Sequence, residues 1–146
     1  MIRRLFRADA GTSMVEFALT APVFVLLLMG LIEVGRYTYM GILAAHAAHA
    51  AVSYGSQNLQ TVNDGTGMTN AARTDGQNIS WAVAPTYYCT VAGSPIACPG
   101  NNGSVSPQLV YYVQVTVSSS FTPLFHYPGL PSANVSSTAV MPVQNQ

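Results

Sequence analysis

The stretch Gly11–Arg36 reads GTSMVEFALTAPVFVLLLMGLIEVGR, and it decides how the N-terminal part of the chain folds. It contains a lone carboxylate, Glu16, followed by an uncharged apolar run from Phe17 to Ile32. A helix needs about 20 residues to cross the hydrocarbon core of a bilayer, and the segment Thr12–Val34 is long enough. A carboxylate at the mouth of such a segment is costly, so it usually has a function. The stretch therefore predicts a membrane-anchoring helix with a polar N-terminal end.

Three interpretations fit a basic N-terminus followed by an apolar run. A secretory signal peptide has this layout, but Glu16 interrupts the junction and residues 32–36 form a poor cleavage site. A plain transmembrane helix requires Glu16 to lie among lipid headgroups or to find a partner. In a prepilin-type signal, residues 1–11 form a leader that is removed on the cytoplasmic side, and Glu16 becomes the fifth residue of the mature chain.

Basic residues set the expected orientation of the helix. Three arginines precede the apolar run and one closely follows it: Arg3, Arg4, Arg7 and Arg36. Because positive residues remain on the cytoplasmic side, we expect the N-terminus inside and the C-terminal part of the chain outside.

Several short motifs recur in the same order in one known family. They are a glycine, an acidic–aromatic pair, a proline, a charged helix end and an alanine-rich continuation: Gly11, Glu16-Phe17, Pro22, Glu33-Val34-Gly35-Arg36 and residues 44–51. With these motifs the segment Gly11–Gly55 resembles the TadE-like minor pilin (pseudopilin) family of tight-adherence (Tad/Flp) type IV pilus systems. The late segment Val113–Met141 is similar to the C-terminal part of longer members.

The resemblance implies that a prepilin peptidase cuts between Gly11 and Thr12. It also implies a single-pass protein of the bacterial inner membrane, with a cytoplasmic N-terminus and a periplasmic C-terminal head. The expected role is assembly or anchoring of an adhesive pilus, into which the protein itself can be incorporated outside the cell. The implied partners are the peptidase, other pilins or pseudopilins, and the pilus assembly machinery.

The charged residues at the two ends of the apolar run have separate expected roles. The new amino group of Thr12 would be a cation near the bilayer, and Glu16, one helical turn away, could neutralise it in its own chain or in a neighbouring subunit. The alternative is that Glu16 only reaches the lipid headgroups. At the other end, Glu33 and Arg36 are spaced i, i+3 and can pair at the far membrane surface. Pro22 removes one helix hydrogen bond, so we expect a bend there.

The helical pattern continues from the apolar run to about Gly55. Small residues repeat at positions that allow close helix–helix approach: Gly41, Ala44, Ala45, Ala48, Ala51 and Gly55. His46 and His49 share a helix face with Tyr39 and Ile42, but a metal site needs further ligands. We therefore predict solvent-facing or interface histidines and no metal.

Composition argues against several classes of function. Charged residues make up 7% of 146 residues, and the formal net charge is +0. Arg73 is the only arginine or lysine beyond Arg36, so no basic patch for nucleic acid is expected. No nucleophile elbow, phosphate loop or recognisable carboxylate pair occurs. We expect a protein that is not an enzyme and has no cofactor.

The C-terminal part of the sequence predicts a small disulfide-bonded β structure. Cys89 and Cys98 flank a turn signal at Gly93, which indicates a hairpin or compact loop. In an exported domain two cysteines favour a disulfide, and two free thiols in a reducing compartment are the alternative.

Two segments alternate apolar and polar residues and predict an antiparallel pair of strands with one face against the long helix. They are Leu109–Ser120 and Val135–Val143. The proline-rich segment Phe121–Pro131 either covers the core of the head or presents a docking surface. Residues 56–78 are rich in Asn, Thr and Gly and predict a loop, with helix at most over Met68–Arg73.

These observations predict an α+β fold: a long N-terminal transmembrane and stalk helix with a small antiparallel β-sheet head. The expected organisation is a leader at 1–11, the helix at 12–55 and a head with one disulfide loop at 56–146. The expected function is that of a processed minor pilin or pseudopilin. The alternative is an unprocessed bitopic membrane protein whose exported head binds a ligand or partner.

Overall fold

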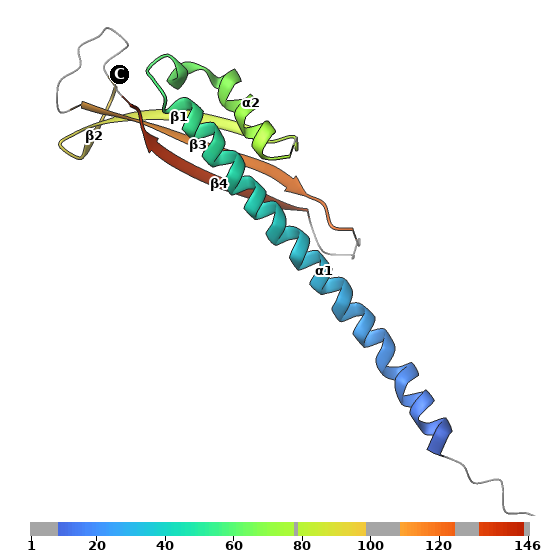
Figure 1. Cartoon of the computed structure of the whole chain (residues 1–146). Coiled ribbons are helices and arrows are strands. Elements are labelled where there is room, and N and C mark those ends of the chain that lie inside the picture. The colour runs from blue at the N-terminus through green and yellow to red at the C-terminus, as the bar shows by residue number, and fades with distance from the viewer. Residues whose placement is uncertain (1–8, 78, 99–108, 125–131, 145–146) are drawn as a thin grey trace, which may run out of the picture. The chain divides into compact units, whose positions relative to one another are not determined.

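The computed structural model describes residues 9–77, 79–98, 109–124 and 132–144. In chain order the elements are α1 (Asp9–Gly55), η1 (Thr61–Asn63), α2 (Gly65–Asp75), β1 (Ala82–Val91), β2 (Ser94–Ile96), β3 (Leu109–Phe121) and β4 (Ala133–Pro142) (Figure 1). The fold is α+β, as predicted: a long apolar N-terminal helix and a small antiparallel sheet. The chain forms two compact units, Met1–Arg36 and Tyr37–Gln146, which are described separately.

The first unit contains the N-terminal part of α1, whose large apolar side chains are mostly exposed within this unit. Met14, Phe17 and Leu31 are 79%, 71% and 69% exposed. An exposed apolar surface of this size would be unfavourable in water, because each buried Leu- or Phe-sized side chain contributes about 1.5–3 kcal/mol. By length and composition, α1 is a candidate membrane span. The helix is continuous through Pro22.

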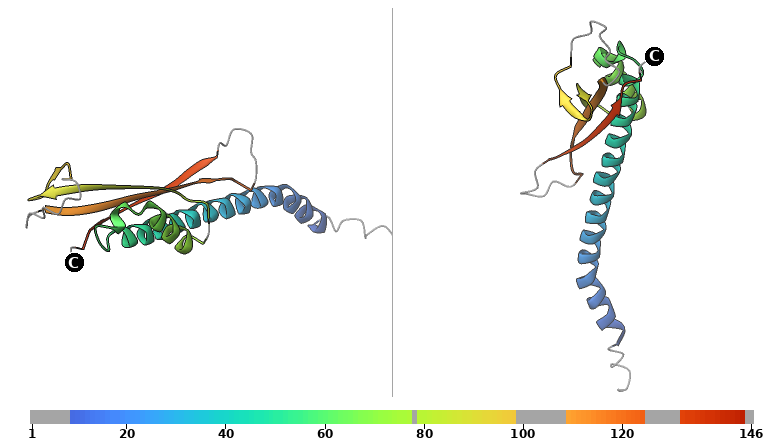
Figure 2. Two further views of the ribbon diagram at one scale, coloured as in Figure 1. Left: turned by 90° about the horizontal axis from the view of Figure 1, so that it is seen from above. Right: turned by 90° about the vertical axis from the view of Figure 1, so that its left-hand side faces the viewer.

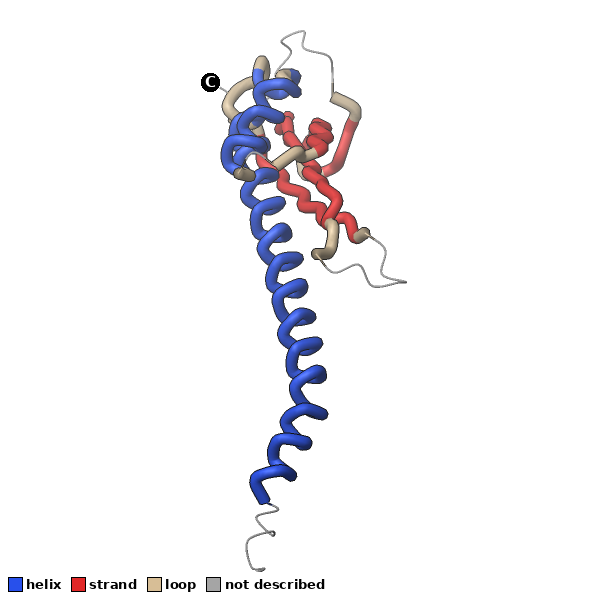
Figure 3. The backbone as a smooth tube through the Cα atoms, turned by 90° about the vertical axis from the view of Figure 1, so that its right-hand side faces the viewer, coloured by secondary structure: helices blue, strands red, loops and turns tan. Residues whose placement is uncertain are grey.

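The second unit contains a four-stranded sheet with the strand order β2-β1-β3-β4, and all neighbouring strands are antiparallel. Figure 3 shows its strands in red. The two predicted strands are confirmed as β3 and β4, and they pair with each other, for example at Val113 and Met141. The predicted alternation is also confirmed, because residues at odd positions from Leu109 to Val117 are buried and those between them are more exposed.

Residues 37–55 of α1 lie against one face of this sheet (Figure 2). Ala44, Ala47, Ala48 and Ala51 are fully buried in the same cluster as the inward-facing valines of β3, which are Val113, Val115 and Val117. A methyl side chain lets the helix backbone approach the sheet closely. Most of the small residues for which we expected helix–helix contact, including Ala44, Ala48 and Ala51, are thus buried inside the chain's own core.

Two elements are longer than the sequence predicted. The expected helix at Met68–Arg73 extends over Gly65–Asp75, because Asp64 caps it: its carboxylate accepts a hydrogen bond from the Gly67 N–H at 2.9 Å. Burial of Met68 and Ala72 then holds the helix in place. Most of the expected loop at 56–78 is therefore helical.

Strand β1 begins at Ala82, whereas the sequence predicted a hairpin or compact loop only around Cys89–Cys98. The proline within it, Pro85, obscured the pattern. The Val143 N–H donates to the Tyr111 carbonyl, so the backbone polar groups of Tyr111 point toward β4. The direction alternates along a strand, so every second residue after Tyr111 in β3 also points its N–H and C=O groups toward β4. Val115, the partner of Pro85, is one of these residues. Pro85 therefore occupies a position where no N–H is needed for the β1–β3 ladder.

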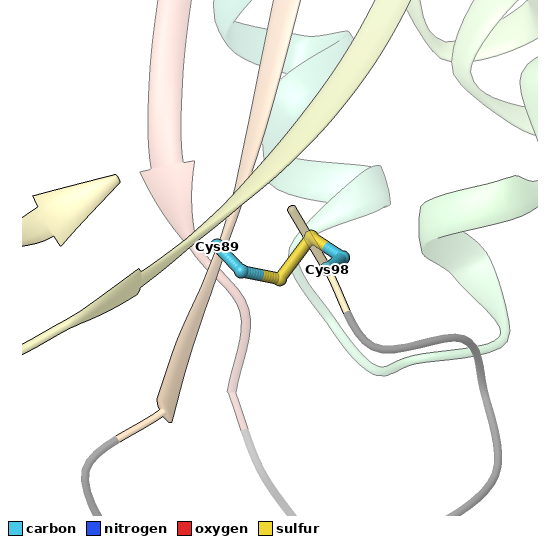
Figure 4. Close-up of a disulfide and its surroundings, with 2 residues drawn as sticks. All are labelled: Cys89 and Cys98. Atoms are coloured by element: carbon cyan, nitrogen blue, oxygen red, sulfur yellow. A yellow bond between two sulfur atoms is a disulfide. The ribbon is translucent and has the colours of Figure 1, made fainter. Parts of the chain in front are cut away.

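The predicted hairpin and disulfide are both present. Strands β1 and β2 are joined by Ala92 and Gly93, whose φ angles of 50° and 82° form the tight turn that β-hairpins prefer. The disulfide joins Cys89 of β1 to Cys98, just after β2, with 5.0 Å between their Cα atoms (Figure 4). Cys89 is fully buried, so the bridge fixes β2 to the core.

The proline-rich segment can be described only at its start. Phe121 is buried, and its ring contacts the Tyr37 ring edge-on at 5.5 Å between centroids. Leu124 is 61% exposed. Residues 125–131 lie outside the described residues, so both expectations for this segment remain predictions.

Candidate functional site

The predicted cleavage site lies within α1, close to the first residue that the structure describes. The described part of the helix starts at Asp9, and the backbone of Gly11 and Thr12 is helical. Glycine lowers helix stability by about 1 kcal/mol relative to alanine. Gly11 therefore weakens the helix next to the predicted cleavage site.

Glu16 lies four residues after Thr12 on the same helix, and its side chain is exposed. Residues four apart are neighbours on a helix surface, so an amino group at Thr12 would be within reach of this carboxylate. The Thr20 hydroxyl donates to the backbone carbonyl of Glu16 at 2.9 Å and leaves the carboxylate unused. Within the described part of the chain, no hydrogen bond or ion pair to the Glu16 carboxylate is found.

Glu33 and Arg36 form the predicted ion pair at the far end of the apolar run. The distance between the Arg36 guanidinium and the Glu33 carboxylate is 3.2 Å. Their side chains are 18% exposed for Glu33 and 40% for Arg36. Exposed pairs of this kind contribute only about 0–1 kcal/mol, so the pair is better suited to marking a polar boundary than to stabilising the helix.

The two histidines of α1 point away from the core. His46 and His49 are exposed, on the side of the helix opposite the buried alanines. Tyr39 and Ile42 share this side and are each 50% exposed. Among the described residues, no group of three His, Cys, Asp or Glu side chains is placed to hold a metal ion.

One polar connection was not predicted from the sequence. The Tyr54 hydroxyl, near the end of α1, donates to the Asp64 carboxylate at 2.6 Å, and the same carboxylate caps α2. These two hydrogen bonds hold the pKa of Asp64 below its ordinary value, the one from Tyr54 contributing most. The Asp-Gly-Thr-Gly sequence could have indicated this helix start, since Asp is a preferred N-cap residue.

Comparison with known proteins bears on this same N-terminal segment. No curated protein and no solved structure matches the chain. The family described as TadE-like protein matches residues 11–53, which begin at the candidate cleavage site and cover most of α1. The match does not reach the late segment Val113–Met141. The predicted resemblance is confirmed for the N-terminal segment, and residues 11–53 of this chain are TadE-like.

Proposed function

We propose that this protein is a minor pilin or pseudopilin that a prepilin peptidase cleaves between Gly11 and Thr12, and that it takes part in assembling or anchoring a Tad-type adhesive pilus. One observation carries the proposal: the TadE-like match begins at Gly11 and covers most of the candidate membrane span. The work proposed for the protein is non-catalytic. Its partners would be the peptidase, other pilins and the assembly machinery at the bacterial inner membrane.

Gly11, beside the candidate cleavage site, supports processing. A peptidase must bind its substrate in an extended form, so the helix has to open around the cut bond. Gly11 weakens the helix next to this bond and adds no side chain that a narrow cleft must accommodate. The long apolar helix would remain in the mature protein as its membrane anchor.

Glu16 supports a role in assembly. Cleavage would create a positive amino group at Thr12, one turn from an exposed carboxylate. A charge pair in a low-dielectric environment adds little net stability, but it favours one register of packing, because a displaced subunit leaves both charges unpaired. Glu16 could pair with the amine of its own chain or with that of a neighbouring subunit.

The distribution of arginines on the two sides of the apolar run supports the proposed orientation. Arginines precede the apolar run in greater number than they follow it, which favours a cytoplasmic N-terminus. The sheet would then lie in the periplasm, where the Cys89–Cys98 disulfide can form and persist.

The experiment is to express the full chain with a prepilin peptidase and to determine its intact mass and N-terminal sequence. We expect a Thr12 N-terminus that depends on the peptidase and is lost in Gly11→Ala. The matched control is Gly30→Ala, which makes the same change in the same helix at a position where an added Cβ has nothing within 4 Å. That variant should be processed normally.

A chain that keeps its leader in the presence of active peptidase would overturn the proposal. The protein would then be better described as a bitopic membrane protein whose exported head binds a ligand or partner. The shared features, an apolar N-terminal helix and a disulfide-bonded sheet, fit both functions, so cleavage is the measurement that separates them.

A further inference from the structure

Two tyrosines follow the apolar run of α1 closely. The run ends at Ile32, and the next aromatic residues of the chain are Tyr37 and Tyr39, which are 44% and 50% exposed. Because they are two positions apart, their side chains lie on opposite sides of the helix, and the sheet can cover only one of them. Tyrosine is enriched at the boundary between membrane and water, since its ring is apolar and its hydroxyl is polar. The position and exposure of this pair are those of interfacial residues.

The rise of the helix gives the level of these tyrosines relative to a bilayer. At about 1.5 Å per residue, Tyr37 and Tyr39 lie about 7 and 10 Å beyond Ile32 along the helix axis. The polar layer outside the hydrocarbon core is about 5–7 Å thick on each side. Side chains on a helix point back toward its N-terminus, which here is toward the apolar run. Both rings therefore reach the headgroup layer when the end of the apolar run lies at the edge of the hydrocarbon core.

One end of the sheet lies at the level of Tyr37. The Tyr37 ring contacts the ring of Phe121, the last residue of β3, with 5.5 Å between centroids. At the other end of residues 37–55, a Cβ added to Gly55 would lie 3.1 Å from Cγ1 of Val113, near the start of β3. From Val113 to Phe121 the strand rises by about 27 Å, and the helix rises by about the same length from Tyr37 to Gly55. Strand β3 therefore runs beside α1 in the opposite direction, with its Phe121 end at the level of the tyrosines.

We propose that Tyr37 and Tyr39 bind the headgroup layer of the phospholipid bilayer that α1 spans, and that the Phe121 end of the sheet rests at this layer. Continuity of the chain identifies the partner, because the same helix carries both tyrosines and the apolar run. The Tyr39 hydroxyl accepts a hydrogen bond from the Gln77 side-chain amide at 2.9 Å, so its own hydrogen can be donated to a lipid phosphate or ester oxygen. The sheet brings no carboxylate that would repel anionic lipids, since residues 76–146 contain no Asp or Glu. The proposed surface does not include residues 125–131.

The test uses the full chain in vesicles of phosphatidylethanolamine and phosphatidylglycerol, with a second tryptophan introduced as Tyr37→Trp or Tyr39→Trp. The buried Trp81 is common to all samples, and the wild type gives its baseline. The added fluorescence should fall by about half or more with lipids brominated at the acyl carbons nearest the headgroup, and by less with lipids brominated near the chain ends. The inference rests on α1 as the membrane anchor of the proposed function. It does not depend on leader cleavage or pilus assembly, because both tyrosines are present in the processed and the unprocessed chain.

The matched control is Tyr87→Trp, which makes the same change at a tyrosine that is 51% exposed. Tyr87 pairs with Val113, so it lies at the level of Gly55. This level is about 27 Å farther along the helix axis than Tyr37. The fluorescence added by Tyr87→Trp should therefore be unchanged by either brominated lipid.

Flotation of the vesicles distinguishes a failure of the headgroup contact from a failure of the membrane anchor. Protein that does not float with the vesicles would overturn both. If the protein floats but Tyr37→Trp and Tyr39→Trp are quenched no more than Tyr87→Trp, the headgroup contact alone is overturned. Stronger quenching by bromine near the chain ends would also overturn it, because the rings would then lie in the hydrocarbon core. Where Tyr37→Trp disturbs the contact with Phe121, the exposed position of Tyr39→Trp decides the result.

Discussion

Reduction of the Cys89–Cys98 disulfide should destabilise the sheet by an amount that the size of the closed loop predicts. The two cysteines are 9 residues apart. In the chain-entropy model, closing a loop of about ten residues stabilises the folded state by about 2.7 kcal/mol at 25 °C. For a folded unit of about 100 residues, this corresponds to a melting temperature lower by roughly 10–20 °C. Among the described residues, β2 pairs with β1 at three positions, so without the bridge it is weakly held.

The chain carries its own probe for this measurement. Trp81 is the single tryptophan, is 3% exposed, and donates its indole N–H to the Gly76 carbonyl at 3.2 Å. Its fluorescence should therefore report unfolding of the sheet unit in mild detergent. Melting curves are compared with and without reductant, so that the sequence is the same in both samples.

The control is a variant with Cys89→Ala and Cys98→Ala, which should not respond to reductant. If reduction lowers the free energy of unfolding of the wild type by less than about 1 kcal/mol, the loop-entropy reasoning is refuted. It would indicate that the unfolded chain already holds this hairpin together, or that β2 contributes nothing to the stability of the sheet.

Three further predictions use the same probe. Val115→Ala removes two carbons from a fully buried position and should cost about 1.6 kcal/mol or more, whereas Val140→Ala, at 44% exposure, should cost less than half as much. Gly76→Ala should lower the melting temperature, because an added Cβ would overlap the tryptophan indole and a carbonyl of α2; an unchanged value would contradict the packing described at this position. The pKa of Asp64 is lowered in the folded state, so the ionised carboxylate stabilises the fold near neutral pH. This contribution to stability is lost as the pH falls below about 4. In Tyr54→Phe this acid-dependent loss should become smaller, and an identical pH profile would count against the hydrogen bond to Asp64.

The elements with a strong local pattern were predictable from the sequence. The apolar run with its flanking charges predicted α1, and the alternation in β3 placed alternate residues of that strand on the buried face. The disulfide followed from the expected export of a domain with two cysteines. In each case the signal lies in residue order alone and needs no knowledge of the remaining fold.

The parts that were missed depend on contacts between distant residues. Helix α2 contains Gly, Thr and Asn, which are weak helix formers, and it is held by burial of Met68 and by the cap at Asp64. Strand β1 contains Pro85. This proline is tolerated because Val115, its partner in β3, directs its own backbone groups toward β4 and needs no N–H from β1. Small residues on α1 are equally compatible with contact to another helix and contact to a sheet, so the sequence could not distinguish the two.

The row of buried alanines on α1 limits how this helix can bind other proteins. Any side chain larger than a methyl group at Ala44, Ala47, Ala48 or Ala51 would push the helix away from its sheet, since all four are 0% exposed. Substitutions in this row should therefore be selected against for their size, even when they are hydrophobic. Because the row is already in use within the chain, a partner helix that runs beside residues 37–55 must approach from the opposite side, where it meets Tyr39, Ile42 and the two histidines.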